Sequence, residues 1–262
     1  MKWNINELEE SFAGKAFGYR LHYYAKIGST NDEAFHLGLA GAPEGTAVLA
    51  DTQTKGRGRF QRSWHSPAGA NIYTSVILRP SLKITESSQI PIMAGVAVAD
   101  ALERYCSGKI SLKWPNDVLV HEKKIAGILS QARMMGNHLD FIVLGIGINV
   151  NMRHELFPEK ICGTATSLIL EAGREIRRED VLISLYENLE KWYKQLTQKG
   201  FGSVKFKWLS MTSMIGRNVQ VAFKNETVVG KATEIDDDGS LILLTDGNKK
   251  ITVSSGDATM KR

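Results

Sequence analysis

The sequence predicts an α+β protein: a mixed or antiparallel sheet with covering helices, followed by a small β-barrel. Between residues 110 and 151, short β-rich segments follow one another through short turns, which favours α+β over a doubly wound parallel fold. Beyond Gly216, four short β-rich segments are typical of a small barrel. They are separated by Lys224-Asn225, Asp236-Asp237-Asp238-Gly239 and Asp246-Gly247-Asn248. A length of 262 residues suits one medium and one small domain. We place these domains at residues 1–213 and 214–262.

The elements follow from local patterns in chain order. A first helix is expected over residues 6–14, with Asn6 as its cap, Glu9 at the capping-box position and Gly14 at its end. Residues 90–106 predict an amphipathic core helix. The other expected helices are 30–40, 166–171, 178–198 and 201–210, and the expected strands are 21–26, 46–50, 71–80, 110–114, 118–120, 125–132, 141–151, 218–223, 226–235, 240–244 and 249–253.

Composition restricts the classes of partner. A net charge of +5 allows an anionic partner, and the positive charge gathers in two short stretches, which favours a local anion site over a broad nucleic-acid face. Cys106 and Cys162 give neither a disulfide framework nor a metal-binding pattern, and no apolar segment is long enough to span a bilayer. Met1-Lys2-Trp3-Asn4 lacks a signal-peptide core. We therefore expect a cytoplasmic protein.

Residues 52–64, which we call the glycine loop, carry four cations and two glycines directly after an expected strand. Glycine lets backbone N–H groups approach a ligand oxygen, and arginine supplies planar forks suited to phosphate and carboxylate. We expect the loop to be disordered when empty and ordered by an anion. The alternative interpretations are a solvated basic loop and a nucleic-acid-binding Gly/Arg segment.

Two other stretches have both a structural and a functional interpretation. Ser29-Thr30-Asn31 can simply cap the helix that follows it. Pro115-Asn116-Asp117 interrupts a strand and is either a turn or the edge of a site.

Lys123 and Lys124 lie on opposite faces of a strand, so only one of them can point inward.

Four blocks in order carry a family resemblance: Gly56-Arg57-Gly58-Arg59 with Trp64 after it, Lys113-Trp114-Pro115-Asn116-Asp117, Lys123-Lys124-Ile125-Ala126-Gly127, and Gly145-Ile146-Gly147-Ile148-Asn149. Together they resemble a biotin–protein ligase. The resemblance implies a catalytic domain like that of class II synthetases and an SH3-like tail. It also implies biotin and ATP with Mg²⁺ as the reactants, biotinyl-5′-AMP as the intermediate, and a biotin carboxyl carrier protein as the partner.

The resemblance also implies roles for individual residues. Lys124, Arg59 and Asp117 are the expected catalytic residues, with Mg²⁺ near Asp117 and no dedicated metal site. The expected biotin-binding residues are Ser29, Thr30, Asn31, Gln53, Gly56, Arg57, Gly58, Arg59, Trp64, Lys124 and Gly127. The expected ATP-binding residues are Arg57, Arg59, Arg62, Asn116, Lys124 and Asn149.

The chain departs from some members of the family. The segment before Ile27 is too short for a DNA-binding helix-turn-helix, so we expect no DNA partner, and Phe60-Gln61 is less basic than the Arg-Gly of some members. A homodimer paired through the sheet fits the resemblance, and no membrane partner is expected. The competing functions are a lipoate–protein ligase, a nucleic-acid-binding module and a biotin or nucleotide sensor.

Overall fold

The computed structural model, which describes residues 2–106, 110–223 and 226–260, contains a seven-stranded mixed sheet in the order β1-β2-β3-β7-β6-β5-β4. Only β1 and β2 run parallel; the other neighbouring pairs are antiparallel. The predicted α+β class with a mixed sheet is therefore confirmed. The strands are β1 (Leu21–Tyr24), β2 (Ala47–Ala50), β3 (Ile72–Leu78), β4 (Ile110–Lys113), β5 (Asp117–Val120), β6 (Lys123–Met135) and β7 (His138–Ile148).

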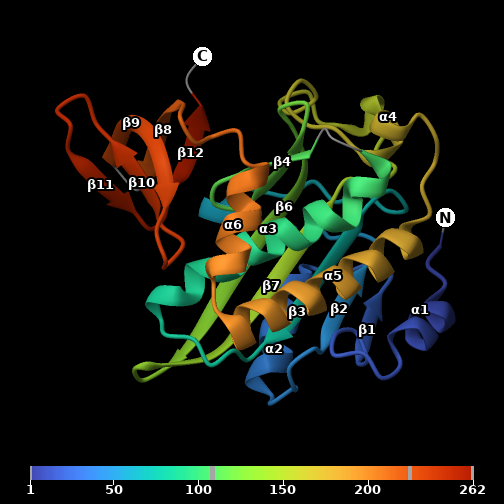
Figure 1. Cartoon of the computed structure of the whole chain (residues 1–262). Coiled ribbons are helices and arrows are strands. Elements are labelled where there is room, and N and C mark those ends of the chain that lie inside the picture. Colours follow the sequence, from blue (N-terminus) through green and yellow to red (C-terminus); the bar gives the residue numbers. More distant parts are fainter. Residues whose placement is uncertain (1, 107–109, 224–225, 261–262) are drawn as a thin grey trace.

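Helices cover both faces of this sheet. Figure 1 shows α3 (Gln89–Leu102), α5 (Arg178–Lys199) and α6 (Gly202–Met211) lying across one face. On the opposite face, α2 (Thr30–Leu39) packs on a small cluster that includes Val48, Ile77 and Val143. Strand neighbours such as Leu49 and Leu144 belong instead to the main core, as the alternation of side chains requires. The shorter helices are α1 (Ile5–Phe12), α4 (Leu168–Ala172) and the 3₁₀ turns η1 (Arg59–Gln61), η2 (Thr85–Ser88), η3 (Glu103–Tyr105) and η4 (His154–Leu156).

Two expected helices differ in detail. The cap of α1 is Asn4, not Asn6: its side-chain oxygen accepts from the backbone N–H of Glu7 at 3.4 Å. Helix α3 ends at Leu102 and is buried nearly all round, rather than amphipathic. The reason is that α3 packs on the sheet and also contacts α5 and α6, so little of its surface is left for water.

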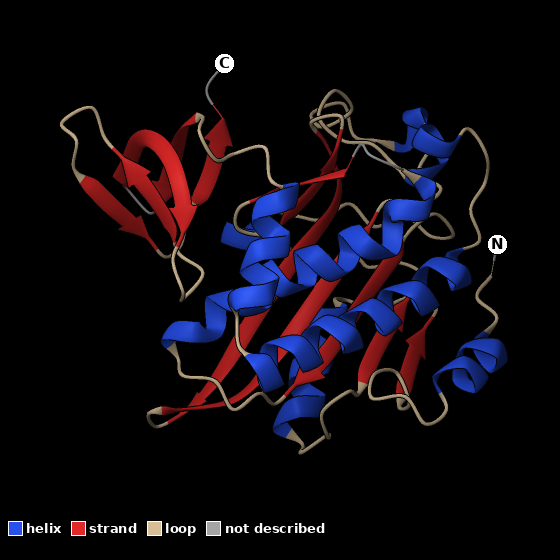
Figure 2. Cartoon of the chain, viewed as in Figure 1, coloured by secondary structure: helices blue, strands red, loops and turns tan. Residues whose placement is uncertain are grey.

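The C-terminal part is a five-stranded antiparallel sheet in the order β11-β10-β9-β8-β12, and Figure 2 shows it to be built of strands alone. Its strands are β8 (Asn218–Phe223), β9 (Glu226–Ile235), β10 (Leu241–Leu244), β11 (Lys250–Val253) and β12 (Asp257–Met260). The sequence analysis missed β12, which pairs with β8. Its four residues follow Gly256 too closely to give a separate β signal.

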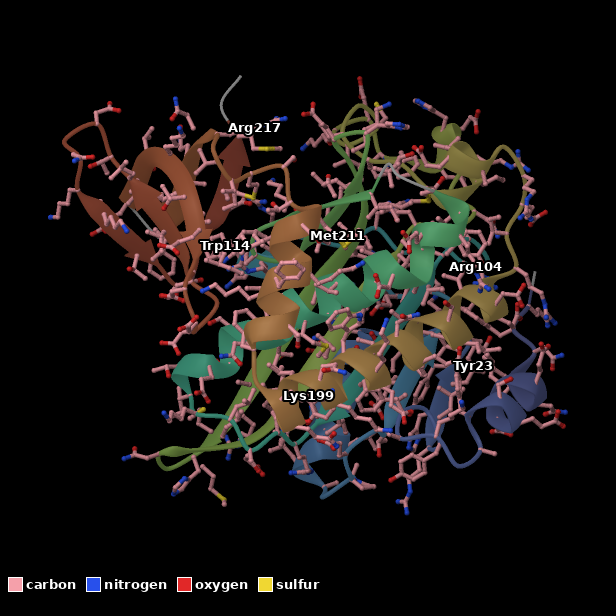
Figure 3. All side chains as sticks on the ribbon, viewed as in Figure 1. Tyr23, Arg104, Trp114, Lys199, Met211 and Arg217 are labelled. Carbon is pink, nitrogen blue, oxygen red and sulfur yellow. The ribbon has the colours of Figure 1, made fainter. Side chains whose placement is uncertain are left out.

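The acidic turn 236–239, which we call the docking turn, fixes this small sheet against the larger domain. The Ser88 hydroxyl donates to the carbonyl of Asp238 at 2.6 Å, and the Gln89 amide donates to that of Asp237 at 2.7 Å. Trp114, buried at the junction in Figure 3, donates its indole N–H to the carbonyl of Gly239 at 3.0 Å. The two sheets are therefore held together by hydrogen bonds, of which the one from Trp114 is buried. Within the described residues, no helix combines the length and apolar character needed to cross a membrane.

Candidate active site

A cavity of about 350 Å³ lies between the glycine loop, the start of α2, strands β5 to β7 and strand β12. Residues expected from the sequence gather on its wall: Ser29, Thr30, Asn31, Gln53, Arg57, Gly58, Arg59, Arg62, Trp64, Asn116, Asp117, Lys124, Gly127 and Asn149. Gly56 is the expected residue that does not line the cavity. A side chain there would meet the carbonyl of Trp64 at 2.5 Å and the Ser66 hydroxyl at 2.7 Å, so Gly56 lets the loop fold back on itself.

Three glycines on neighbouring strands form a floor without side chains, which we call the glycine floor: Gly127 on β6, and Gly145 and Gly147 on β7. Gly127 lies opposite Gly147 in the sheet register. A Cβ on Gly147 would lie 2.6 Å from the indole nitrogen of Trp64, and one on Gly145 would lie 1.8 Å from Oδ1 of Asn31. The floor thus allows Trp64 and Asn31 to lie directly against the sheet. The indole N–H of Trp64 is buried with no hydrogen-bond partner in the described part of the chain.

Ser29-Thr30-Asn31 does not serve as a side-chain cap for α2: Ser29 occupies the cap position without making a capping hydrogen bond. Instead, Thr30 donates its backbone N–H to Oε1 of Gln53 at 2.9 Å. The amide of Asn31 donates to the carbonyl of Leu129 at 3.3 Å. The simple capping interpretation is therefore wrong, and the cluster forms a polar network at the cavity wall.

Two serines complete this network and were missed. Ser75 on β3 places its hydroxyl 2.7 Å from Oδ1 of Asn31 and 2.8 Å from the hydroxyl of Thr30. Ser66 accepts from the amide of Gln53 at 3.1 Å. Ser75 sits in a strand that is buried at every position, where the sequence pattern indicates core packing rather than a site.

Lys124 approaches the cavity, whereas its neighbour Lys123 is exposed. The Lys124 ammonium lies 2.5 Å from one carboxylate oxygen of Asp117 and 5.4 Å from the centre of the Trp64 ring. Lys113, not named as a site residue in the sequence analysis, also lines the cavity and reaches Asp117 at 4.0 Å. Asp117 thus stands between two ammonium groups beside the glycine floor.

The arginines of the glycine loop each have a protein partner. Arg57 forms an ion pair with Asp32 at the start of α2. Arg59 donates to Ser255 and Gly256, just before β12, and Arg62 forms an ion pair with Asp257, the first residue of β12. Burial lowers the pKa of Arg59 below its ordinary value, yet an arginine stays cationic at neutral pH. The ordering of the loop by an anion stays a prediction.

Both asparagines of the expected ATP site are engaged with the backbone. Asn116 donates to the carbonyl of Ile128 at 2.7 Å. Asn149 is buried, donates to the carbonyl of Thr166 at 3.0 Å and accepts from the amide of Asn71 at 3.4 Å. These contacts give Asn149 the geometry of a group that holds the segment after β7 in place.

The cavity also has lining residues that the sequence analysis did not name. An apolar side comes from the segment between β7 and α4, and a second contribution comes from β12. These residues are Met152, Phe157, Ile161, Thr164, Ala165, Asp257 and Thr259. No local pattern distinguishes them, because only the folding of distant segments brings them to one cavity.

A mixed sheet with a glycine floor, a basic glycine loop, an inward lysine and a small C-terminal β domain defines the biotin and lipoate ligase class. Residues 23–149 match the model of the Biotin/lipoate A/B protein ligase family, and residues 214–260 match that of the Biotin protein ligase C terminal domain. The chain belongs to the biotin/lipoate A/B protein ligase family.

Relatives cover nearly the whole chain. The Bifunctional ligase/repressor BirA of Bacillus subtilis is 38% identical over 95% of this chain and 77% of its own. The Biotin--[acetyl-CoA-carboxylase] ligase of Mycobacterium tuberculosis is 33% identical over 97% and 94%. The biotin protein ligase of Aquifex aeolicus, solved in complex with biotin and ATP, superposes with a TM-score of 0.79 at 32% identity, covering 93% of this chain and 99% of that one.

Proposed function

We propose that this chain is a biotin–protein ligase. It activates biotin with ATP to biotinyl-5′-AMP and pyrophosphate, and then transfers biotin to a lysine of a biotin carboxyl carrier protein. The observation that carries the proposal is the convergence of Lys124 with Arg57, Arg59 and Arg62 on one cavity above the glycine floor. Relatives named as biotin ligases, and a similar structure solved with biotin and ATP, support it.

The first step requires two anions to meet. An oxygen of the biotin carboxylate attacks the α-phosphorus of ATP, and pyrophosphate leaves. Cations fixed at the cavity lower the repulsion and stabilise the charge that develops. Lys124 suits this role because its ammonium reaches the cavity and Asp117, at 2.5 Å, orients it. Arg59, which also lines the cavity, would stabilise the phosphates as well.

Magnesium enters this proposal with the nucleotide. The described residues contain no group of three or more His, Cys, Asp or Glu side chains placed to hold a metal ion. Mg²⁺ is commonly held by substrate phosphates with one or two carboxylates, so Asp117 fits a Mg-ATP complex. When bound, the ion would neutralise part of the charge on the triphosphate.

The polar network and the indole suit the two ends of biotin. Thr30, Asn31 and Gln53 offer donors and acceptors for a ureido ring, and Trp64 would exclude water from the reactive mixed anhydride. In the second step the carrier's lysine amine attacks the acyl carbon, AMP leaves and the amine loses a proton. Asp117, which lines the cavity beside Lys124, is a carboxylate that could accept or direct that proton.

The test is to incubate the purified chain with biotin and Mg-ATP, follow pyrophosphate release, then add a biotin carboxyl carrier domain and probe for covalent biotin. We expect Lys124→Ala to lower pyrophosphate release by about 100-fold or more. Lys123→Ala, which removes the exposed neighbour, is the matched control and is expected to keep full activity. Lipoate with a lipoyl domain tests the sister activity: labelling by lipoate alone would refute the assignment to biotin.

Several further features belong to the same proposal. The division at residues 213 and 214 is tested by expressing the two parts separately. The absence of a DNA partner is tested by mobility shift. A homodimer is tested by sedimentation with and without biotin. A cytoplasmic location accords with Cys106 and Cys162, which form no disulfide.

A further inference from the structure

The glycine loop is tied to the C-terminal domain by two arginine side chains. Arg59 donates from one terminal nitrogen to the carbonyl of Gly256 at 2.8 Å and from the other to the Ser255 hydroxyl at 3.1 Å. Arg62 lies 2.5 Å from the carboxylate of Asp257. The acceptors are three consecutive residues, 255–257, which we call the acceptor turn.

The acceptor turn has little freedom to move. A side chain on Gly256 would lie 2.4 Å from Cγ1 of Val221, so the backbone there packs directly against β8. Asp257 opens β12 and is paired with Ala222 in the sheet register. The small sheet thus presents its carbonyl, hydroxyl and carboxylate acceptors in fixed positions.

The small sheet is in turn fixed to the glycine floor. The docking turn accepts hydrogen bonds from Ser88, Gln89 and Trp114, and the Trp114 contact is buried. Strand β5 begins three residues after Trp114, at Asp117, and it pairs with β6, which carries Lys124. A chain of fixed contacts therefore runs from Lys124 through the docking turn to the acceptor turn and back to the loop arginines.

The loop needs such support. Phe60 and Gln61 adopt φ values of 53° and 60°. This is the left-handed backbone conformation, which residues other than glycine rarely adopt. Conformations of this kind persist where surrounding contacts hold them. The contacts around these two residues include the acceptor-turn bonds of Arg59 and Arg62 and the bond from the Gly58 N–H to the Arg62 carbonyl at 2.7 Å.

We propose that Ser255, Gly256 and Asp257 are positioning residues for adenylation. They hold Arg59 and Arg62 at the cavity, so that the C-terminal domain supplies the geometry of the cation pair although it carries neither arginine. The role in adenylation rests on the proposed function above; the holding of the loop does not.

The kinetic test is a double-mutant cycle with Asp257→Asn, Arg62→Ala and the double variant. Because Asp257 acts through Arg62, we expect the KM for Mg-ATP in biotin-dependent pyrophosphate release to rise about threefold to tenfold in Asp257→Asn. The double variant should be no worse than Arg62→Ala. Asp246→Asn, an exposed residue of another turn in the same domain, removes the same charge and should change nothing. Additive effects would overturn the proposal, as would a lower KM in Asp257→Asn, because the turn would then compete with the nucleotide.

A second readout needs no substrate. Trypsin cleavage at Arg57, Arg59 and Arg62 reports how often the loop leaves the acceptor turn. We expect cleavage to be about threefold to tenfold faster in Asp257→Asn and Ser255→Ala than in the parent chain and Asp246→Asn. Equal rates in all four proteins would overturn the proposal. If the parent chain released no pyrophosphate, the proposed function and the adenylation role would both fail, while cleavage would still decide whether the turn holds the loop.

Discussion

Replacing Gly147 by alanine tests the glycine floor directly. The added Cβ would lie 2.6 Å from both Nε1 and Cε2 of Trp64. Carbon atoms in ordinary contact lie about 3.5–4.0 Å apart, so the indole must move by about 1 Å. The backbone of Trp64 is held by its bond to the carbonyl of Gly56 at 2.9 Å, which limits how the ring can adjust. Overpacking of this kind costs about 1–3 kcal/mol, which corresponds to roughly 5- to 150-fold weaker binding.

The assay is calorimetric titration with biotin, beside thermal unfolding. We expect weaker binding with little change in the unfolding temperature, because the loop can leave the sheet without unfolding the domain. Gly95→Ala is the matched control: its Cβ would meet Leu112 at 3.6 Å and Ile128 at 3.8 Å, both ordinary contacts. Removing a mid-helix glycine adds about 1 kcal/mol of stability, or about 2–4 °C, and should leave biotin binding unchanged.

Making the same substitution in the Trp64→Ala variant shows whether the added methyl group meets the indole or biotin itself. In Trp64→Ala, the substitution Gly147→Ala should have almost no further effect on biotin affinity, because the ring that it displaces is gone. If Gly147→Ala weakens binding equally in both backgrounds, the methyl group meets biotin itself and the reasoning about the indole is wrong. Unchanged affinity in the parent background would refute the packing altogether.

Two further predictions concern stability. Trp114→Phe leaves the buried carbonyl of Gly239 without its donor and should lower the free energy of unfolding by about 1–3 kcal/mol in urea titration; an unchanged midpoint would contradict the role of the docking turn. Burial alone would raise the pKa of Asp100, but hydrogen bonds from Trp192 and Lys207 outweigh it and lower that pKa below its ordinary value. A lowered carboxyl pKa stabilises the fold above the unfolded value of about 3.9, and this stability is lost as the pH falls through the folded pKa. The unfolding temperature of Asp100→Asn should therefore lie below that of the parent chain at pH 7 and approach it near pH 3, and a constant gap would count against the ion pairs.

Local patterns predicted what local physics controls. Helix α5 was expected at residues 178–198 and spans Arg178–Lys199, because a long apolar stripe with helical spacing has few other solutions. The short turns expected within residues 110–151 include the one between β6 and β7, where Gly136 adopts a φ of 59°. The inward position of Lys124 followed from the resemblance, because alternation alone left Lys123 and Lys124 equivalent.

Contacts between residues far apart in the sequence could not be predicted from it. Arg59 and its acceptor Gly256 are separated by 197 residues, and nothing near either residue indicates the other. Ser75 was hidden for a different reason: its strand is buried on both faces, so a functional hydroxyl looks like a tolerated core residue. The three aspartates of the docking turn indicated only a turn between two strands.

The docking turn has a consequence for exchanging domains between relatives. Three of its acceptors are main-chain oxygens, from Asp237, Asp238 and Gly239, so most of the attachment depends on backbone geometry; the Asp237 carboxylate adds one exposed ion pair with Lys205 of α6. Substitutions at the first two positions should leave a chimera's domains joined. The third is different, because Gly239 adopts a φ of 86° and a side chain there would lie 3.0 Å from Ile92. Inserting or deleting one residue in this turn would shift all three oxygens at once, so a graft should preserve its length before its sequence.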